Sequence, residues 1–303
     1  MTCNCIAGIT TYNPKIERLQ LNVEAIMNQV KEVLIIDNAS DNIRQIESIF
    51  FKYENLRIIK NKSNMGIAYA MNIIGKYASN NGYDWFLTLD QDSVCPANLV
   101  EIYAQYIDSN VGIIAPYIHF NDSFISQLLH LNNNEIIDER KVKTVDYVIS
   151  SGQFIQTKVW EKVDGFWEYL FIDYVDQEFC FHVSKMGYKI LQIRDIELSH
   201  EPGIPVKVMG IMTAKQSAFR EYYWARNSRI VYWMYKKEYM NAIGRLPFWS
   251  SMKRVANVIL VRENIAIKLK AIFAGIVDAH FWKKNNKKNQ RIPLSVDENR
   301  RYK

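Results

Sequence analysis

Two carboxylates, two positions apart, follow an apolar stretch of the chain. Asp90 and Asp92 come directly after residues 85–89, whose aromatic and aliphatic side chains predict a buried strand. A strand that ends in alternate acids presents both at the mouth of a sheet. Mg²⁺ and Mn²⁺ prefer such oxygen ligands, and Mg²⁺ typically binds one or two carboxylates together with substrate phosphates. The pattern indicates a metal that holds nucleotide phosphates, although Asp-x-Asp alone is too common to establish one.

The elements before this motif place other polar residues in equivalent positions. Short apolar strands are expected at residues 5–10, 33–36, 56–59 and 85–90, with amphipathic helices between them. This alternation predicts βαβ units and a Rossmann-like, mostly parallel sheet flanked by helices. Ligands of such sheets bind beyond the carboxyl ends of the strands. Thr11, Asp37, Asn64 and Asp90 all lie at these ends, so position and chemistry coincide.

The rest of the chain has a less regular pattern. Further strands are expected at residues 111–116, 145–149 and 189–193, a turn at 161–166, and a helix from Asp176 to a glycine cap at Gly187. Residues 121–139 are interpreted as an excursion or mobile loop. Beyond residue 218 the chain becomes aromatic and basic, with helical periodicity.

Composition limits the class of protein. A chain of 303 residues with 49% hydrophobic content can bury a full core. It contains no apolar run of the roughly 18 residues that would span a bilayer, and no secretory signal is visible at its start. The four cysteines form no disulfide or zinc pattern, and Cys3 and Cys5 are expected to be buried on one face of the first strand. These features favour a cytoplasmic protein.

Charge is unevenly distributed along the chain. Residues 231–303 contain 16 Lys and Arg against 5 Asp and Glu, whereas the remainder has 22 against 27. With interspersed aromatic residues, such a region could lie on an anionic membrane surface. The alternatives are an ordinary helix face packed on the rest of the chain, or a homodimer contact. A nucleic-acid partner is disfavoured because it would leave the acidic strand ends without a purpose.

Seven segments, in this order, resemble the motifs of the inverting, family-2-type glycosyltransferases. They are TTYNP at 10–14, IIDNAS at 35–40, NMG at 64–66, DQDS at 90–93, FIDYVDQE at 171–178, SHEPG at 199–203 and REYYWARN at 220–227. The resemblance covers approximately residues 5–230 and is closest to the bacterial rhamnosyltransferases that build surface polysaccharides. It implies a GT-A fold for residues 1–230, with a nucleotide-binding half at 1–92 and an acceptor half at 93–230. Residues 231–303 then form a basic helical extension.

The resemblance also implies roles for the donor-side residues. Asp92 coordinates the metal, Asp90 reaches the metal or the ribose, and His200 completes the metal shell or binds a phosphate. Asp37 accepts a hydrogen bond from the imide N–H of the base, which uracil and thymine share. Thr11, Asn64 and Arg226 contact the nucleotide sugar.

On the acceptor side, the resemblance makes Asp176 the catalytic base that deprotonates the acceptor hydroxyl. Most of these roles have a structural alternative, and Asp90 and Asp92 could simply be solvated acids at the end of a strand. Asp37 could be a turn residue, and Asn64 could be only a helix N-cap. Asp176 could cap its own helix, with Asp173 or Glu178 as the base, while Arg226 could form an ion pair and His200 could be structural.

The function that the resemblance implies is metal-dependent, inverting transfer of L-rhamnose from dTDP-β-L-rhamnose. The acceptor is a saccharide or lipid-linked saccharide in bacterial polysaccharide or O-antigen synthesis. The first alternative is the same chemistry with a UDP-sugar, such as UDP-galactofuranose, UDP-galactose or UDP-N-acetylglucosamine. The second is a non-catalytic module that binds nucleotide sugars or glycans. A location at the cytoplasmic face of the cell membrane would suit a lipid-linked acceptor.

Overall fold

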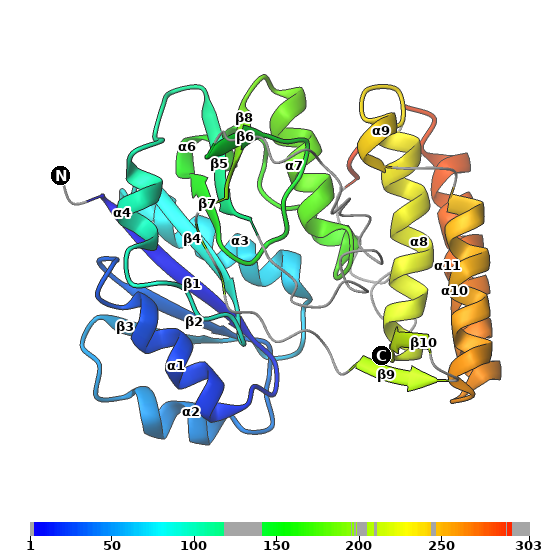
Figure 1. Cartoon of the computed structure of the whole chain (residues 1–303), viewed down its shortest axis with the longest axis horizontal. Helices are drawn as coiled ribbons and strands as arrows, with labels where there is room; N and C mark the ends of the chain where they lie inside the picture. The colour runs from blue at the N-terminus through cyan, green and yellow to red at the C-terminus, as the bar shows by residue number, and fades with distance from the viewer. Residues whose placement is uncertain are drawn as a thin grey trace. The chain divides into compact units, whose positions relative to one another are not determined.

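The computed structural model describes residues 3–117, 141–194, 196, 198, 205–208, 211–243, 247–288 and 290–292. The chain forms two compact units (Figure 1). Unit 1 comprises Met1–Met65, Tyr69–Phe166 and His182–Glu201, and unit 2 comprises Gly66–Ala68, Trp167–Phe181 and Pro202–Lys303. Both units are therefore discontinuous in sequence.

Unit 1 is built on a mixed, mostly parallel sheet. Its strands are β1 (Cys5–Thr11), β2 (Val33–Asp37), β3 (Leu56–Lys60), β4 (Trp85–Asp90), β5 (Val111–Pro116), β6 (Val142–Thr144), β7 (Gln153–Gln156) and β8 (Lys189–Ile193). They lie in the order β3-β2-β1-β4-β7-β5-β8-β6. The pairs β3–β2, β2–β1, β1–β4 and β5–β8 are parallel, whereas β7 is antiparallel to β4 and β5, and β6 is antiparallel to β8.

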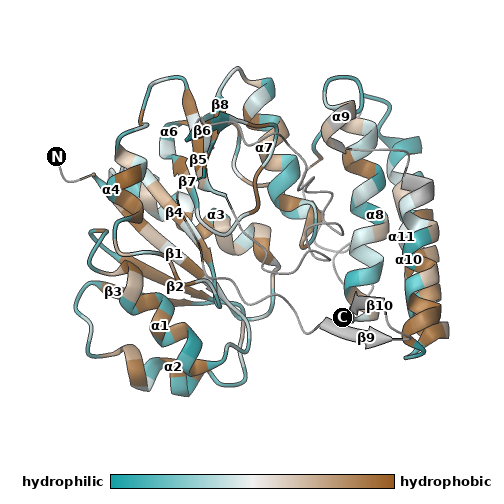
Figure 2. Ribbon diagram, in the orientation of Figure 1, coloured by the Kyte–Doolittle hydropathy of each residue, from teal (hydrophilic) through white to brown (hydrophobic). Residues whose placement is uncertain are grey.

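The two faces of the sheet bury different helices, because successive side chains of a strand alternate between faces. Cys5, Ala7 and Ile9 of β1 share a core with α1 (Ile16–Ile26), α2 (Ile43–Phe50) and α4 (Leu99–Ala104). On the opposite face, a Cβ at Gly8 would collide with Ile74 of α3 (Ile67–Asn80). Helix α6 (Thr157–Lys162) also packs there, where Trp160 contacts Phe86. Figure 2 shows the apolar residues concentrated along the central strands.

The strands of the first half, and those at 111–116 and 189–193, confirm the sequence-based predictions. The strand predicted at 145–149 is wrong, since the ladder forms three residues earlier, in β6. Within 145–149, the N–H of Val145 still bonds the carbonyl of Ile190 in β8, at 3.0 Å. Beyond it, Val148 is buried and its carbonyl accepts a hydrogen bond from the Gln153 side chain. Neither β7 nor α6 was predicted.

Unit 2 is mainly helical. It contains the short 3-10 helix η1 (Glu168–Leu170), the first residues of α7 (Val175–Lys185), a hairpin of β9 (Pro205–Val208) and β10 (Ile211–Ala214), and the helices α8 (Ala218–Tyr235), α9 (Met240–Ile243), α10 (Pro247–Val261) and α11 (Ile265–Asn285). Helices α8 and α11 lie so close that a Cβ at Gly275 would collide with the carbonyl of Tyr222. The boundary expected at residue 230 falls inside α8, and the domain division at that position stays a prediction.

Two composition-based expectations concern the chain as a whole. The four cysteines are free thiols. Within the described ranges, no helix has both the length and the apolar character needed to cross a lipid bilayer.

Candidate active site

The carboxyl ends of β1 and β2 bring Thr11 and Asp37 together. The two residues are partners in the parallel register, and the Thr11 hydroxyl donates to Asp37 Oδ1 at 3.1 Å. The next strand along, β4, pairs Asp90 with Thr10. Three of the predicted polar residues therefore lie at one edge of the sheet, as the βαβ pattern required.

Asp37 is fixed by the turn that follows β2. Its Oδ1 accepts from the Ser40 hydroxyl at 2.5 Å and its Oδ2 from the Ser40 backbone N–H at 2.9 Å. The same hydroxyl accepts from the backbone N–H of Asn13, at 2.8 Å, so the turns after β1 and β2 are joined. A carboxylate offers about four lone-pair positions, and three are used here. Asp37 is 1% exposed, so the turn role that sequence alone left open is present in the structure.

Asn38 connects this turn to the loop that precedes α3. Its Oδ1 accepts from the Asn61 side chain at 2.9 Å and from the Met65 backbone N–H at 3.5 Å. Asn64 lies in this loop and is half-buried. The loop that contains Asn64 is thus hydrogen-bonded to the turn that follows Asp37.

The Asp90–Ser93 turn is held from two sides. Helix α1 donates to its backbone, with Asn22 on the carbonyl of Asp90 at 2.7 Å and Arg18 on the carbonyl of Asp92 at 2.7 Å. On the other side, Ser151 accepts from the Asp90 N–H at 3.3 Å and donates to the Ser93 hydroxyl at 2.6 Å. The turn is therefore a rigid support for the two half-buried carboxylates. Neither Asn22 nor Ser151 was predicted, because single polar residues far from a motif give no signal in sequence.

The donor set at this turn fits a hard divalent cation. Two carboxylates with substrate phosphates and water are a usual ligand set for Mg²⁺. Within the described ranges, no group of three or more His, Cys, Asp or Glu side chains could hold a metal by itself. His200, the third predicted ligand, lies outside the described residues.

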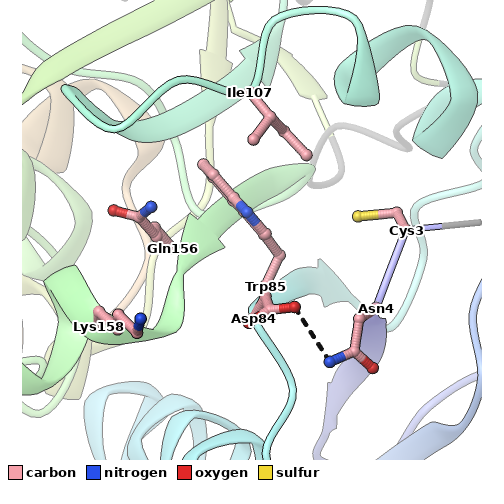
Figure 3. A pocket seen from close by; sticks show the side chains of 7 residues that line it. All are labelled: Cys3, Asn4, Asp84, Trp85, Ile107, Gln156 and Lys158. Carbon is pink, nitrogen blue, oxygen red and sulfur yellow. Dashed lines mark hydrogen bonds between the residues drawn. The ribbon is translucent and has the colours of Figure 1, made fainter. Parts of the chain in front are cut away.

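A cavity of about 330 Å³ lies at the other edge of the sheet. Figure 3 shows its lining, which includes Asn4, Trp85 and Gln156. Asn4 and Trp85 stand at the amino ends of β1 and β4. The cavity is therefore separate from the carboxyl-end site.

In unit 2, the predicted base Asp176 stands in the first turn of α7 and is half-buried. Its Oδ1 accepts the backbone N–H of Gln177 at 2.9 Å. The positive end of the helix dipole favours a negative charge at this position. The loop before it contains three non-glycine residues with positive φ, namely Phe171, Asp173 and Tyr174.

The two alternative bases are already engaged. Glu178 is 0% exposed and accepts two hydrogen bonds from Arg291 and one from the hydroxyl of Tyr235. Asp173 accepts from Arg220 at 2.6 Å. Glu178 is thus enclosed by its partners, and Asp173 forms an ion pair with Arg220.

The surroundings of Arg226 argue against its predicted contact with the nucleotide sugar. The side chain is 1% exposed and enclosed by the rings of Tyr169, Tyr222 and Tyr223. Its guanidinium donates to the carbonyl of Tyr169 at 2.5 Å. A group enclosed in this way has no surface for a phosphate, and Arg226 instead holds the backbone of its own unit. Burial of this kind also raises the pKa of Tyr222 and Tyr223, although the Arg226 charge opposes the shift.

Asn72 of α3 has a structural role. Its amide forms two hydrogen bonds with the backbone of Phe166, at 2.8 and 2.9 Å, and its Oδ1 also accepts from the Trp160 ring N–H. Helix α3 is thereby tied to the turn after α6.

Comparison with known proteins adds independent findings. The sequence profile described as Glycosyl transferase family 2 matches residues 7–162. The chain is 30% identical over 237 residues to the dTDP-rhamnosyl transferase RfbF of Shigella flexneri, which covers 75% of this chain and 79% of the relative.

Solved structures of similar fold include TarS 1–349 of S. aureus in complex with UDP-GlcNAc. Its TM-score is 0.52 at 15% identity, over 97% of this chain and 77% of that one. GalNAc-T7 with UDP, GalNAc and Mn²⁺ has a TM-score of 0.58 at 12% identity, over 97% of this chain and 59% of that one. At such low identity these likenesses show the fold alone.

Proposed function

The chain belongs to glycosyl transferase family 2 and is a glycosyltransferase with a GT-A fold, and from this premise we propose that it transfers L-rhamnose from dTDP-β-L-rhamnose. The observation that carries the donor assignment is the 30% identity, over most of both chains, to a protein named as a dTDP-rhamnosyl transferase. The acceptor in this proposal is a saccharide or lipid-linked saccharide of a bacterial surface polysaccharide.

The strand-end residues supply the donor site in this proposal. In this proposal Asp37 accepts the imide N–H of the base at its fourth lone-pair position. Asp92 and Asp90 would hold Mg²⁺ or Mn²⁺ against the diphosphate, with His200 as a further ligand. A bound metal would neutralise the charge that grows on the leaving diphosphate.

Asp176 would act as the general base. An acceptor hydroxyl is a weak nucleophile at neutral pH, so a carboxylate must take its proton as the new bond forms. Attack on the face opposite the diphosphate inverts the anomeric centre. A β-linked donor would then give an α-L-rhamnoside.

A second candidate is the same reaction with a UDP-sugar. The two structures of similar fold are described with UDP-GlcNAc and with UDP, GalNAc and Mn²⁺. Because uracil and thymine offer the same imide edge, Asp37 does not discriminate between them. A non-catalytic module that binds nucleotide sugars or glycans is less well supported, since acids suited to both metal and base roles are present.

Nucleotide release from a panel of donors separates these candidates. The purified chain is incubated with Mg²⁺ or Mn²⁺ and each of dTDP-rhamnose, UDP-galactose, UDP-galactofuranose and UDP-GlcNAc, with and without extracts that contain acceptor. We expect dTDP from dTDP-rhamnose alone. Release of UDP instead would favour the second candidate, and no release from any donor would favour the non-catalytic module.

Two variants test the proposed base and the proposed metal ligand separately. Asp176→Asn should lower transfer by about 10²–10⁴-fold with unchanged donor affinity. Asp92→Ala should weaken donor affinity and its dependence on metal. The control is Glu101→Gln, which removes an exposed carboxylate of α4. An Asp176→Asn protein with full transfer would remove Asp176 from the mechanism.

We further propose that helices α10 and α11 contact an anionic membrane surface. They expose the large apolar side chains of Met252, Ile259, Ile267, Phe273 and Phe281. On α11, Ile267, Lys270, Phe281 and Lys284 recur at helical spacing along one exposed face. Apolar groups flanked by lysines are suited to the headgroup region of a bilayer.

The exposed basic region is smaller than expected from sequence. Lys268 is buried, Arg254 pairs with Glu221, and Arg291 pairs with Glu178.

Co-sedimentation with vesicles tests this contact. Binding to vesicles that contain anionic phosphatidylglycerol should exceed binding to neutral phosphatidylcholine vesicles, and should fall with salt. The double variant Ile267→Ser, Phe281→Ser should lose binding, whereas Phe51→Ser, at an exposed position of unit 1, should not. Absence of binding at low salt, with a dimer by light scattering that the double variant dissociates, would assign the same face to a second copy.

A further inference from the structure

Five consecutive backbone carbonyls precede the helix of Asp176, and each accepts a hydrogen bond from a distant part of unit 2. Asn227 of α8 donates its side-chain amide to the carbonyls of Leu170, Ile172 and Asp173, at 2.8, 2.8 and 2.9 Å. The neighbouring Arg226 binds the carbonyl of Tyr169. The remaining carbonyl, that of Phe171, accepts the backbone N–H of Ile67, at 2.8 Å. We call residues 169–173 the clamped loop.

The clamped loop stores backbone strain. Phe171 has φ 66° and ψ −64°, and the N–H of Ile172 bonds the carbonyl of Leu170 at 2.7 Å, which is the geometry of the rare classic γ-turn. Asp173 and Tyr174 follow with φ of 61° and 66°. Each such conformation costs on the order of 1–3 kcal/mol in a non-glycine residue, and persists only where the surroundings hold it. Strain of this kind clusters at functional sites.

Asn227 is the group best placed to hold this strain. It is 0% exposed, it lies on a helix of 18 residues, and its Oδ1 accepts the Arg226 Nε–H at 2.9 Å, which orients the amide. Its N–H groups face three carbonyls that flank the γ-turn. An amide is required at this position because no other small side chain offers two donors and an acceptor together.

The clamped loop leads directly into α7. Tyr174 follows it, the carbonyl of Tyr174 accepts the first helical N–H, from Glu178 at 3.0 Å, and Asp176 stands between them. Any shift of the loop therefore moves the helix start that presents the Asp176 carboxylate. Misplacement of a reacting group by about 1 Å can cost on the order of 10²-fold in rate.

We propose that Asn227 is a positioning residue for acceptor activation, which acts through the clamped loop on Asp176. The inference rests on the proposed role of Asp176 as base. It goes beyond that role by assigning a function to Asn227, for which the sequence had suggested none.

The central test is a double-mutant cycle. Asn227→Ala should lower the kcat of transfer by about 10–100-fold, with the Kd for the nucleotide-sugar donor unchanged. Donor hydrolysis in the absence of acceptor should fall less than transfer. In an Asp176→Asn background, Asn227→Ala should have no further effect beyond about twofold, because the group it positions is already lost.

The matched control is Ser228→Ala. Ser228 is also buried on α8, and its hydroxyl bonds within its own helix, to the carbonyl of Ala225. This variant should keep the wild-type kcat. If Asn227→Ala does not fold, Asn227→Ser, which keeps one donor, is measured by the same criteria below its melting temperature.

The possible outcomes test the positioning role of Asn227 separately from the role of Asp176 as base. Full transfer by Asp176→Asn would overturn the proposed base, and the inference with it. Loss of transfer in Asp176→Asn together with wild-type kcat in Asn227→Ala would overturn the positioning role alone. A further tenfold loss in the double variant, or a parallel fall in donor affinity, would show a general structural role and also overturn it.

Discussion

Glu178 and Arg291 form a bidentate ion pair across 113 residues of sequence, with N···O distances of 2.9 and 2.7 Å. The hydroxyl of Tyr235 adds a third hydrogen bond to the carboxylate, at 2.7 Å. Beside Arg291, the carbonyl of Ile292 accepts the ring N–H of Trp167, at 2.8 Å. Residues 291–292 therefore fasten to both α7 and the segment before the clamped loop, all within unit 2.

Removal of Arg291 should destabilise this unit. Arg291→Ala leaves the fully buried Glu178 carboxylate without its cation, and breaking a buried pair in this way costs about 3–5 kcal/mol. Chemical denaturation followed by circular dichroism measures the change in unfolding free energy. Lys288→Ala, which removes an exposed cation three residues earlier, should change it by less than about 0.5 kcal/mol. Equal effects of the two variants would contradict the assignment.

Replacing both Glu178 and Arg291 by apolar residues separates the effect of their charges on stability from the effect of side-chain packing. Glu178→Leu with Arg291→Met removes both charges, and such exchanges are often neutral or stabilising. The double variant should therefore recover most of the stability that Arg291→Ala loses. If it remains as unstable as the single variant, shape and not charge explains the loss.

Gly66 is predicted to be intolerant of alanine. It has φ +87°, and a Cβ would lie 2.6 Å from the carbonyl oxygen of Phe171. Gly66→Ala should therefore combine backbone strain with displacement of the clamped loop, and should lower both thermal stability and transfer. Gly82→Ala is the matched control, because Gly82 has φ +70° but a Cβ there meets nothing within 4 Å. Strain alone costs about 1–3 kcal/mol in either variant, so only Gly66→Ala should lose transfer. Similar activity of the two variants would argue against the contact with Phe171.

Variants of Thr11 and Asp37 test whether Asp37 contacts the base of the nucleotide, because they should weaken nucleotide binding to different degrees. Asp37→Ala removes the carboxylate, whereas Thr11→Val removes only one of the three hydrogen bonds to it described above and keeps the shape of the side chain. If Asp37 contacts the base, Asp37→Ala should raise the Kd for dTDP by about 10-fold or more, and Thr11→Val by a smaller factor. Isothermal titration with dTDP provides the measurement. An unchanged Kd in Asp37→Ala would restrict Asp37 to its turn.

The strand-end site could be predicted from sequence because it depends on local patterns. Each strand of the first half is a short apolar run, and parallel strands must place their final polar residues at a common edge, so Thr11, Asp37 and Asp90 follow from spacing alone. The family motifs then suggested roles for these positions.

The interactions of unit 2 could not be predicted in this way. An arginine in sequence fits a phosphate, an ion pair or a buried network equally well, and Arg226 belongs to the last of these. The bond between Glu178 and Arg291 depends on tertiary packing, and no local pattern marks it. The short strand β6 escaped prediction for a related reason, since three residues on a sheet edge carry too few alternations to be recognised.

Buried phenols should make the protein unstable in alkali. Burial raises the pKa of Tyr103 and Tyr235 well above the usual value, and raises that of Tyr222 as well. An exposed phenol in the unfolded chain ionises near pH 10. Below that pH both states are protonated, and the stability contribution is fully present. As pH rises above about 10, the unfolded chain loses protons that the folded chain retains, so the free energy of unfolding falls. Cys95 acts in the same direction, since burial raises the pKa of its thiol to about 12.

Melting temperatures between pH 8 and pH 11, with tyrosinate absorbance recorded in parallel, check this expectation. The absorbance of the buried phenols should appear together with the loss of helical circular dichroism. Tyr103→Phe removes one fully buried phenol, and with it the hydrogen bond to the Gly152 carbonyl at 2.9 Å. It should lower stability at pH 8 but make the alkaline decline shallower, because one fewer proton is released on unfolding. A decline as steep as that of the wild type would show that Tyr103 does not contribute to it.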